Sequence, residues 1–256
     1  MADQGPRTGT QAIERALSVL AVLESGADTA TLTELANGTG LSPSTTHRLA
    51  RALCEADFMR QDPATERYGF GRRLVTLGQR ASNALGLGAA RVTLETLAAD
   101  TGESVNLGVR DGDEVVVLLD VASAQRLRFD QEVGARVPVY ASAMGKALLA
   151  HADDPDAVVA ALPRLAKLTG STITSRSALR AELDEVRERG WALNDEEREA
   201  GVRTVAAPVL DPSGHSVAAI AVQGPTIRMT DDRLDEVAAR VQRAAADVAG
   251  QLLIPL

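Results

Sequence analysis

The chain has 256 residues, 45% of them hydrophobic and 2% aromatic, which allows two domains with aliphatic cores and argues against an aromatic surface that stacks single-stranded nucleic acid. Its one cysteine, Cys54, excludes an intrachain disulfide and a cysteine-based zinc site. Of the 27 basic and 35 acidic residues, nine of each lie in residues 1–80, so the net charge of −8 belongs wholly to the rest. Without a signal core or a bilayer-length apolar run, we expect a soluble cytoplasmic protein, with residues 1–9 disordered.

The first third of the chain carries the periodicity of three short helices, a hairpin and a longer fourth helix. The expected ranges, in order, are 11–24, 34 to about 37, 43–55, 58–70 and 71–85. Ser42 and Pro43 suit the N-cap and first position of the third helix, and Thr33 suits the N-cap of the second. Three short helices followed by a hairpin are typical of a winged helix-turn-helix, which places its third helix in the DNA major groove.

The outward side of that third helix has the chemistry of a surface that binds double-stranded DNA. Residues 42–51 contain no acid, and short hydroxyl side chains precede longer hydrogen-bond donors. Arginine can read guanine through two hydrogen bonds, and hydroxyls suit phosphates or base edges. Singly, each arginine fits a solvated face as well, and His47 fits packing equally well. We predict DNA contacts from Ser42, Ser44, Thr45, Thr46, His47, Arg48 and Arg51, and from Arg60 and Arg67 beside the hairpin tip.

Strand and helix patterns alternate after Gly86 and Gly88, where we place the domain boundary. The expected strands are 104–109, 114–121, 127–129, 191–194, 205–210 and 216–223. The expected helices are 91–100, 142–151, 157–162, 177–189 and a long final helix capped by Thr230. Because tight turns join neighbouring strands, we expect an α+β fold with an antiparallel sheet flanked by helices. The predicted domains are residues 10–74 (winged helix-turn-helix), 75–88 (linker helix) and 89–256 (second domain).

Several motifs, in chain order, resemble the IclR family of bacterial regulators. They are Leu32–Ala36, Gly40–Leu49, Tyr68–Leu74, Thr101–Leu107, Ala141–Ala147, Asn194–Glu197 and Gly201–Val209. The resemblance covers nearly the whole chain and implies that the second domain is similar to GAF domains and binds a small-molecule effector between its sheet and the loop after the third strand. It also implies a repressor, and a homodimer through the N-terminal domains and helix 72–85, with tetramers through the effector domains. We expect neither a cofactor nor a metal.

The family pattern, carried onto this sequence, implies an effector pocket with eight lining residues. They are Phe129, Val137, Ala143, Met144, Asn194, Thr204, Ala221 and Gln223. Some relatives that bind small carboxylic acids have aspartate, cysteine and two serines where this chain has Asn194, Thr204, Ala221 and Gln223. The neutral lining here still permits a carboxylate or a sugar-like polyol, and Phe129 permits an aromatic ligand. Core packing is an equally good interpretation of each residue, so the effector class stays open.

Two other functional classes compete with a regulator. An enzyme would need catalytic groups, but the three histidines stand in no Gly-x-Ser-x-Gly or His-Glu-x-x-His motif. The acids 195–197 fit a solvated loop or salt bridges better than acid–base catalysis, so we expect no catalytic residue. A protein that only binds partners would have a second domain filled by side chains, without a cavity.

Overall fold

The computed structural model describes residues 8–24, 26 and 28–253, and it divides the chain into two compact units, residues 1–81 and 82–256. The tail predicted to be disordered, residues 1–9, lies outside the described residues except for its last two, which begin the first helix. Helix α4 (Arg72–Ala84) contains the division between the units.

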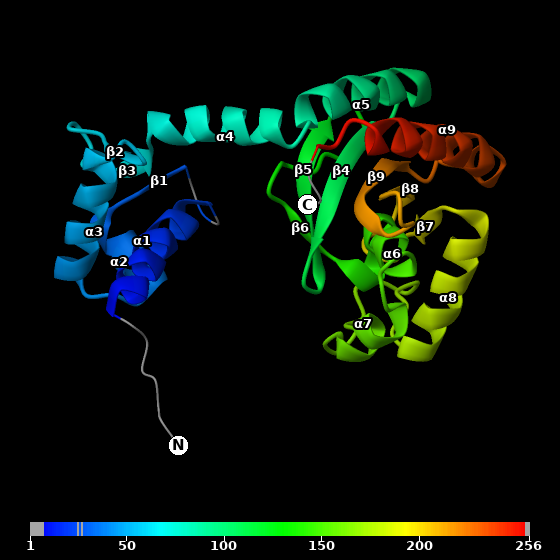
Figure 1. The fold of residues 1–256 in the computed structure, drawn as a ribbon, viewed down its shortest axis with the longest axis horizontal. Coiled ribbons are helices and arrows are strands. Elements are labelled where there is room, and N and C mark those ends of the chain that lie inside the picture. Colours follow the sequence, from blue (N-terminus) through cyan, green and yellow to red (C-terminus); the bar gives the residue numbers. More distant parts are fainter. Residues whose placement is uncertain (1–7, 25, 27, 254–256) are drawn as a thin grey trace. The chain divides into compact units, whose positions relative to one another are not determined.

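Three helices and a small sheet form the first unit (Figure 1). The elements are α1 (Thr8–Glu24), β1 (Thr29–Ala30), α2 (Leu32–Thr39), α3 (Pro43–Glu55), β2 (Met59–Gln61) and β3 (Tyr68–Phe70). The sheet is antiparallel with the order β1-β3-β2, so the predicted hairpin is present and the short β1 extends it. The core between helices and sheet is made of Val19, Leu23, Ala30, Leu35, Ala50, Met59 and Tyr68.

Local hydrogen bonds determine where α2 and α3 begin. Thr31 Oγ1 accepts from the Glu34 backbone N–H at 3.2 Å, and the Glu34 carboxylate accepts from the Thr31 N–H at 2.7 Å. This reciprocal capping box starts α2 at Leu32, so the prediction that Thr33 caps the helix is wrong by two residues. Ser42 caps α3 as predicted, with its Oγ accepting from the Thr45 N–H at 3.3 Å.

The second unit is built on a six-stranded antiparallel sheet with the order β6-β5-β4-β9-β8-β7. Its strands are β4 (Ser104–Asp111), β5 (Glu114–Val121), β6 (Arg136–Pro138), β7 (Ala192–Asp195), β8 (Val202–Leu210) and β9 (Ser216–Pro225). Its helices are α5 (Leu87–Thr101), η1 (Val139–Ala141), α6 (Ala143–Ala150), α7 (Pro155–Ala161), α8 (Arg176–Arg189) and α9 (Asp231–Ala249).

Helices cover both faces of this sheet (Figure 1). α5 and α9 pack on one face around Leu94, Ile220 and Val241, and α6, α7 and α8 pack on the other around Leu148 and Leu179. The antiparallel sheet between helices agrees with the expected fold class. Among the described residues, no helix is both long enough and apolar enough to cross a membrane.

The strand predicted at residues 127–129 is wrong, because this segment leaves the sheet. The backbone carbonyls of Leu127 and Phe129 accept from the side chains of Arg228 (2.9 Å) and Gln223 (3.0 Å) rather than from a neighbouring strand. The edge strand is β6 instead, which pairs with the first residues of β5. We call residues 122–135, between β5 and β6, the strap.

Candidate functional site

The exposed side of α3 carries most of the residues predicted to contact DNA. Ser42, Ser44, His47, Arg48 and Arg51 are exposed, and Thr45 is half-buried. The Arg51 guanidinium pairs with the Glu55 carboxylate at 3.0 Å, so the free positive charge lies nearer the N-terminal half of the helix. An exposed, acid-free N-terminal half is what entry into a major groove requires.

Two predicted DNA contacts are placed differently by the structure. Thr46 is fully buried, and its hydroxyl donates to the Ser42 carbonyl at 3.1 Å, which corrects its assignment to the DNA-facing side. Arg67 donates to the Thr29 hydroxyl (3.0 Å) and carbonyl (2.8 Å) and pairs with Glu34 at 3.1 Å, so its Nε and Nη2 are used within the unit, and its DNA contact stays a prediction. Arg60 is exposed on β2, and its phosphate contact stays a prediction.

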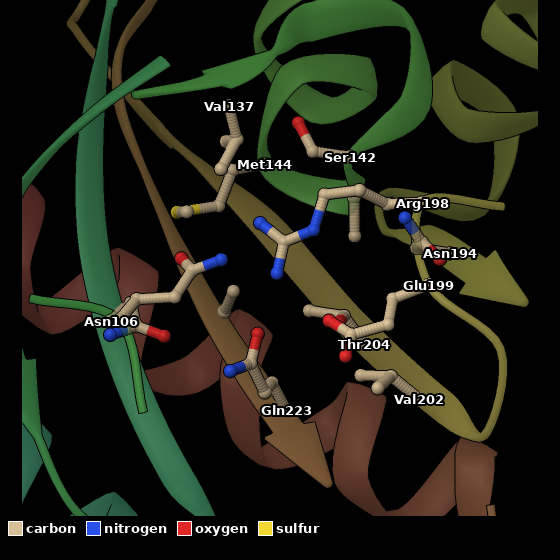
Figure 2. Close-up of a pocket in the computed structure, with 13 residues that line it drawn as sticks. Asn106, Val137, Ser142, Met144, Asn194, Arg198, Glu199, Val202, Thr204 and Gln223 are labelled. Atoms are coloured by element: carbon tan, nitrogen blue, oxygen red, sulfur yellow. The ribbon is translucent and has the colours of Figure 1, made fainter. Parts of the chain in front are cut away.

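A cavity lies in the second unit between the sheet, α6 and the strap (Figure 2). The structure brings together seven of the eight residues predicted for the effector pocket, namely Val137, Ala143, Met144, Asn194, Thr204, Ala221 and Gln223. The eighth, Phe129, is not among the lining residues and contributes its carbonyl to Gln223 instead. The sequence analysis missed Asn106, Gln131, Ser142, Arg198, Glu199 and Val202. The open volume is about 20 Å³, which is room for one water molecule.

Close packing at the start of α6 places Ala143 and Met144 at the cavity. Ser142 caps the helix, its Oγ accepting from the Gly145 N–H at 3.1 Å. A Cβ on Gly145 would lie 2.1 Å from the Val139 carbonyl oxygen, so only glycine lets α6 approach η1 this closely. The lining residues on α6 are therefore fixed by backbone packing.

One of the side-chain amides that line the cavity has a buried oxygen without a hydrogen-bond partner. Asn194 has a partner at each end of its amide, since its Nδ2 donates to the Ala141 carbonyl and its Oδ1 accepts from the Glu197 N–H at 3.0 Å. The Asn106 Nδ2 donates to Asp120 at 2.7 Å, but the Asn106 Oδ1 is buried without a hydrogen-bond partner. A buried acceptor without a partner is costly, and such groups often mark a ligand site.

Arg198 brings a guanidinium into the cavity (Figure 2). When its oxygen faces Arg198, the Gln131 carboxamide accepts from Nη2 at 2.8 Å and also from Nη1. Burial lowers the pKa of Arg198, and the nearby Glu199 carboxylate opposes that shift. The sequence signal for this residue was weak, because Arg198 stands in an acidic run typical of a solvated loop.

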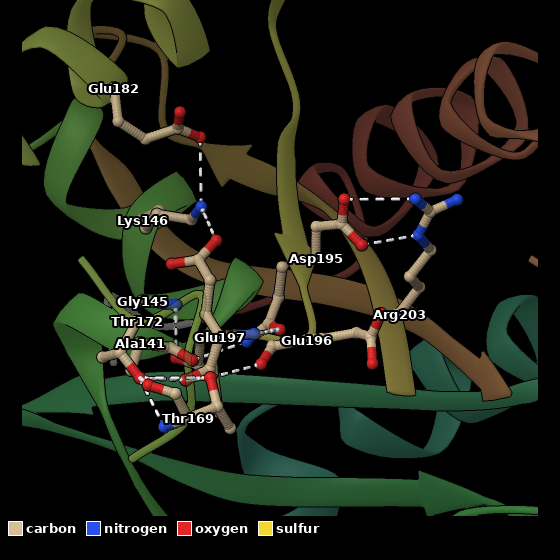
Figure 3. Close-up of polar contacts among 12 residues, drawn as sticks. Ala141, Gly145, Lys146, Thr169, Thr172, Glu182, Asp195, Glu196, Glu197 and Arg203 are labelled. Atoms are coloured by element: carbon tan, nitrogen blue, oxygen red, sulfur yellow. Dashed lines mark hydrogen bonds and ion pairs between the residues drawn. The ribbon is translucent and has the colours of Figure 1, made fainter. Parts of the chain in front are cut away.

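A buried ionic network holds the loop that carries Arg198 (Figure 3). The Lys146 ammonium lies 3.0 Å from Glu182 and 2.5 Å from Glu197, and the Thr172 hydroxyl donates to the Glu197 carbonyl at 2.7 Å. On the other side of the loop, Asp195 pairs with Arg203 at 2.6 Å. The acids at 195 and 197 therefore have the salt-bridge role that we preferred to catalysis. Among the described residues, no cluster of three or more His, Cys, Asp or Glu side chains is arranged to hold a metal ion.

Comparison with known proteins supports both units. The family model of the IclR helix-turn-helix domain matches residues 12–63, and that of the bacterial transcriptional regulator IclR C-terminal domain matches residues 86–250. The HTH-type transcriptional regulator BhcR of Paracoccus denitrificans is 36% identical over 94% of this chain and 87% of its own length. The transcriptional repressor IclR of Escherichia coli is 33% identical over 95% of this chain and 90% of its own length.

Solved structures agree with this assignment. The IclR transcriptional regulator from Alicyclobacillus acidocaldarius has a TM-score of 0.85 and 28% identity, over 94% of this chain and 98% of that chain. An IclR homologue from Microbacterium hydrocarbonoxydans, complexed with 4-hydroxybenzoate, has the same fold, with a TM-score of 0.84 and 24% identity over 94% of this chain and 98% of that chain. The family consists of transcriptional regulators, which decides against the enzyme alternative. The chain belongs to the IclR family of DNA-binding transcriptional regulators.

Proposed function

We propose that this regulator is a repressor whose operator affinity is controlled by a small molecule bound in the second unit. The observation that carries the proposal is the partly open cavity, whose lining combines apolar side chains with amides, two hydroxyls, a guanidinium and a carboxylate. Such a mixture is typical of small-molecule sites. The similarity to a transcriptional repressor over nearly the full length supports repression, and we expect the protein to act in the cytoplasm.

The effector belongs to one of three classes that the lining permits: a small organic acid, a sugar-derived or polyol compound, or an aromatic metabolite. A protein that only binds partners is the alternative, and it predicts that no metabolite binds in this pocket. The effector would act by favouring one of two conformations that differ in operator affinity.

The operator-binding form is a homodimer, with tetramers formed through the second units. Apolar side chains exposed on the first unit support the dimer: Ile13 and Leu17 on α1, and Val75 and Leu77 on α4, are 44–76% exposed. Exposed apolar groups of this kind are typical of an interface. Two recognition helices related by a two-fold axis would read half-sites about 34–36 Å apart.

Fluorescence anisotropy tests this function with the full chain and a labelled duplex selected from random sequences for tight binding. We expect binding to weaken with salt, because counterions are released from the phosphates, and to change when an effector from a metabolite panel is added. A reporter placed behind the selected duplex should be silenced when the chain is expressed. The proposal fails if the duplex is not bound, or if no metabolite of the three classes alters binding.

A further inference from the structure

Arg198 supplies the positive charge among the residues that line the cavity, and its hydrogen-bond partner there is neutral. Among the described residues, no carboxylate forms an ion pair with it, and its hydrogen bonds go to the Gln131 carboxamide. The Glu199 carboxylate also lines the cavity and attracts Arg198, but Glu199 is exposed, so solvent weakens that attraction. A half-buried cation whose hydrogen bonds go to a neutral acceptor lacks the ionic partner that it binds best.

The Gln131 carboxamide occupies the place that a carboxylate would take. The two groups are planar and close in size, and two guanidinium nitrogens already converge on the Gln131 oxygen. A hydrogen bond from guanidinium to carboxylate is roughly twice as strong as one to a neutral acceptor. A carboxylate would therefore gain by replacing Gln131, whereas a neutral polyol would exchange one neutral acceptor for another.

The strap borders the cavity and restricts the size of the ligand. Gln131 belongs to the strap, which is tethered at two other points by Arg228 to Leu127 and by Gln223 to Phe129. With those tethers intact, the space available is the present 20 Å³ together with the volume that the Gln131 side chain leaves. A compact ligand fits that space.

On the sheet side of the cavity, the side-chain oxygen of Asn106 lacks a hydrogen-bond donor. The Asn106 Oδ1 is unpartnered, and Asn106 is 1% exposed. Asn106 and Arg198 both line the cavity, and Figure 2 shows them on opposite sides of it, so a ligand held there lies between them. A hydroxyl is the simplest donor that can accompany a carboxylate.

We propose that the effector is a compact hydroxycarboxylate, with its carboxylate on Arg198 in place of Gln131 and its hydroxyl donating to the Asn106 Oδ1. This inference rests on the proposed function, since it names the chemical class that the effector pocket takes. The strap residue Gln131 then acts as an internal competitor that the effector displaces.

Compounds matched in their number of carbon atoms test the chemistry on the full-length protein. Isothermal titration calorimetry with lactate, propionate and lactamide separates the carboxylate from the hydroxyl, and 2-hydroxybutyrate, butyrate and 2-hydroxybutyramide repeat the test with one more carbon. We expect each hydroxycarboxylate to bind about 2- to 10-fold more tightly than the plain acid, the value of one neutral hydrogen bond, and at least about 10-fold more tightly than the neutral amide.

Three variants assign the groups. Arg198→Gln should lower hydroxycarboxylate affinity by about 10- to 100-fold, the value of a hydrogen-bonded charge. Gln131→Ala should raise it, because the internal competitor is gone, and a gain of affinity is not what a merely structural residue would give. Asn106→Ala should remove the preference for the hydroxyl and keep the preference for the carboxylate. Arg164→Gln, which removes an exposed positive charge outside the cavity, is the matched control and should bind like the wild type.

The outcomes separate this inference from the function on which it rests. If neither hydroxycarboxylate binds, if the neutral amide binds as well as the acid, or if Gln131→Ala does not gain affinity, the inference is overturned. The proposed function survives those results wherever another metabolite class still changes operator affinity. It fails only if no class does.

Discussion

The Lys146 ammonium lies 2.5 Å from the Glu197 carboxylate, and both side chains are buried. Burial raises the pKa of Glu197 above its usual range, and the attraction of Lys146 only partly offsets this effect. The second carboxylate oxygen of Glu197 is buried without a hydrogen-bond partner, which agrees with a group whose charged form is poorly solvated. Because Arg198 follows directly in the chain, the protonation of Glu197 bears on the stability of the loop that enters the pocket.

Replacing Glu197 by glutamine should remove a pH dependence from folding. Since the folded-state pKa is raised above the ordinary 4.5, the native protein holds this proton where the unfolded chain has released it. The contribution of Glu197 to stability therefore falls as pH rises from about 4.5 to the folded-state pKa, and it is constant above that pKa. Urea unfolding of both proteins at a series of pH values should give a difference, wild type minus Glu197→Gln, that declines through this window.

The subtraction controls for other titrating groups. Burial lowers the pKa of His151, so its contribution is lost as pH falls from the ordinary 6.5 towards its folded-state pKa, which is the opposite sign. Both proteins contain His151, so its effect cancels in the difference. Parallel stability curves for the two proteins would show that the Glu197 pKa is not raised on folding.

The start of α2 gives a stability prediction with a control two residues away. Thr31→Ala removes the hydroxyl that accepts from the Glu34 N–H, and it should lower the free energy of unfolding by about 0.5–2 kcal/mol. Thr33→Ala changes an exposed side chain inside the helix and should stay within about 0.5 kcal/mol of the wild type. Equal losses in chemical denaturation would contradict the capping assignment.

The sequence predicted best those elements whose boundaries are set locally. The bounds of α3 were predicted correctly because Ser42 and Pro43 define its start through contacts within one turn. The edge strand β6 was missed because three residues carry no recognisable alternation, and their pairing is decided by the remote start of β5. A tertiary contact also explains the false strand at 127–129, where Arg228 and Gln223 hold the strap outside the sheet.

The pocket residues that were predicted correctly are those supplied by the family pattern. Four of the predicted residues lie within those motifs and three were placed by the wider family pattern, and the structure brings all seven together. Arg198 and Gln131 were missed because each stands in a polar segment, and only folding brings Arg198 against Gln131 of the strap. Thr46 was misassigned because hydroxyl residues suit a DNA-facing side, whereas its position in the helix places it on the buried side with Ala50.

Thr46 and Ser44 on α3 should respond differently to loss of a hydroxyl. Thr46→Val keeps the buried side chain close to its original volume and removes a bond to the Ser42 carbonyl, so stability should change by about 1 kcal/mol or less and DNA affinity should stay the same. Ser44→Ala lies on the exposed side and should weaken DNA binding without a comparable loss of stability. Anisotropy and denaturation of both variants check this. If a stable Thr46→Val protein bound DNA more weakly, the assignment of Thr46 to the buried side would be contradicted.

Arg48 is the exposed α3 arginine that we expect to read a base. Arg48→Ala should weaken binding to the selected duplex by about 1–3 kcal/mol, while binding to random duplex falls much less. A residue that contacts only phosphate would instead lower both affinities together and reduce the salt dependence by about one charge. The matched control is Arg243→Ala, which removes an exposed positive charge from α9 in the other unit and should leave both affinities unchanged. Anisotropy titrations of the three proteins on both duplexes over a range of salt concentrations therefore distinguish base reading, phosphate contact and general charge.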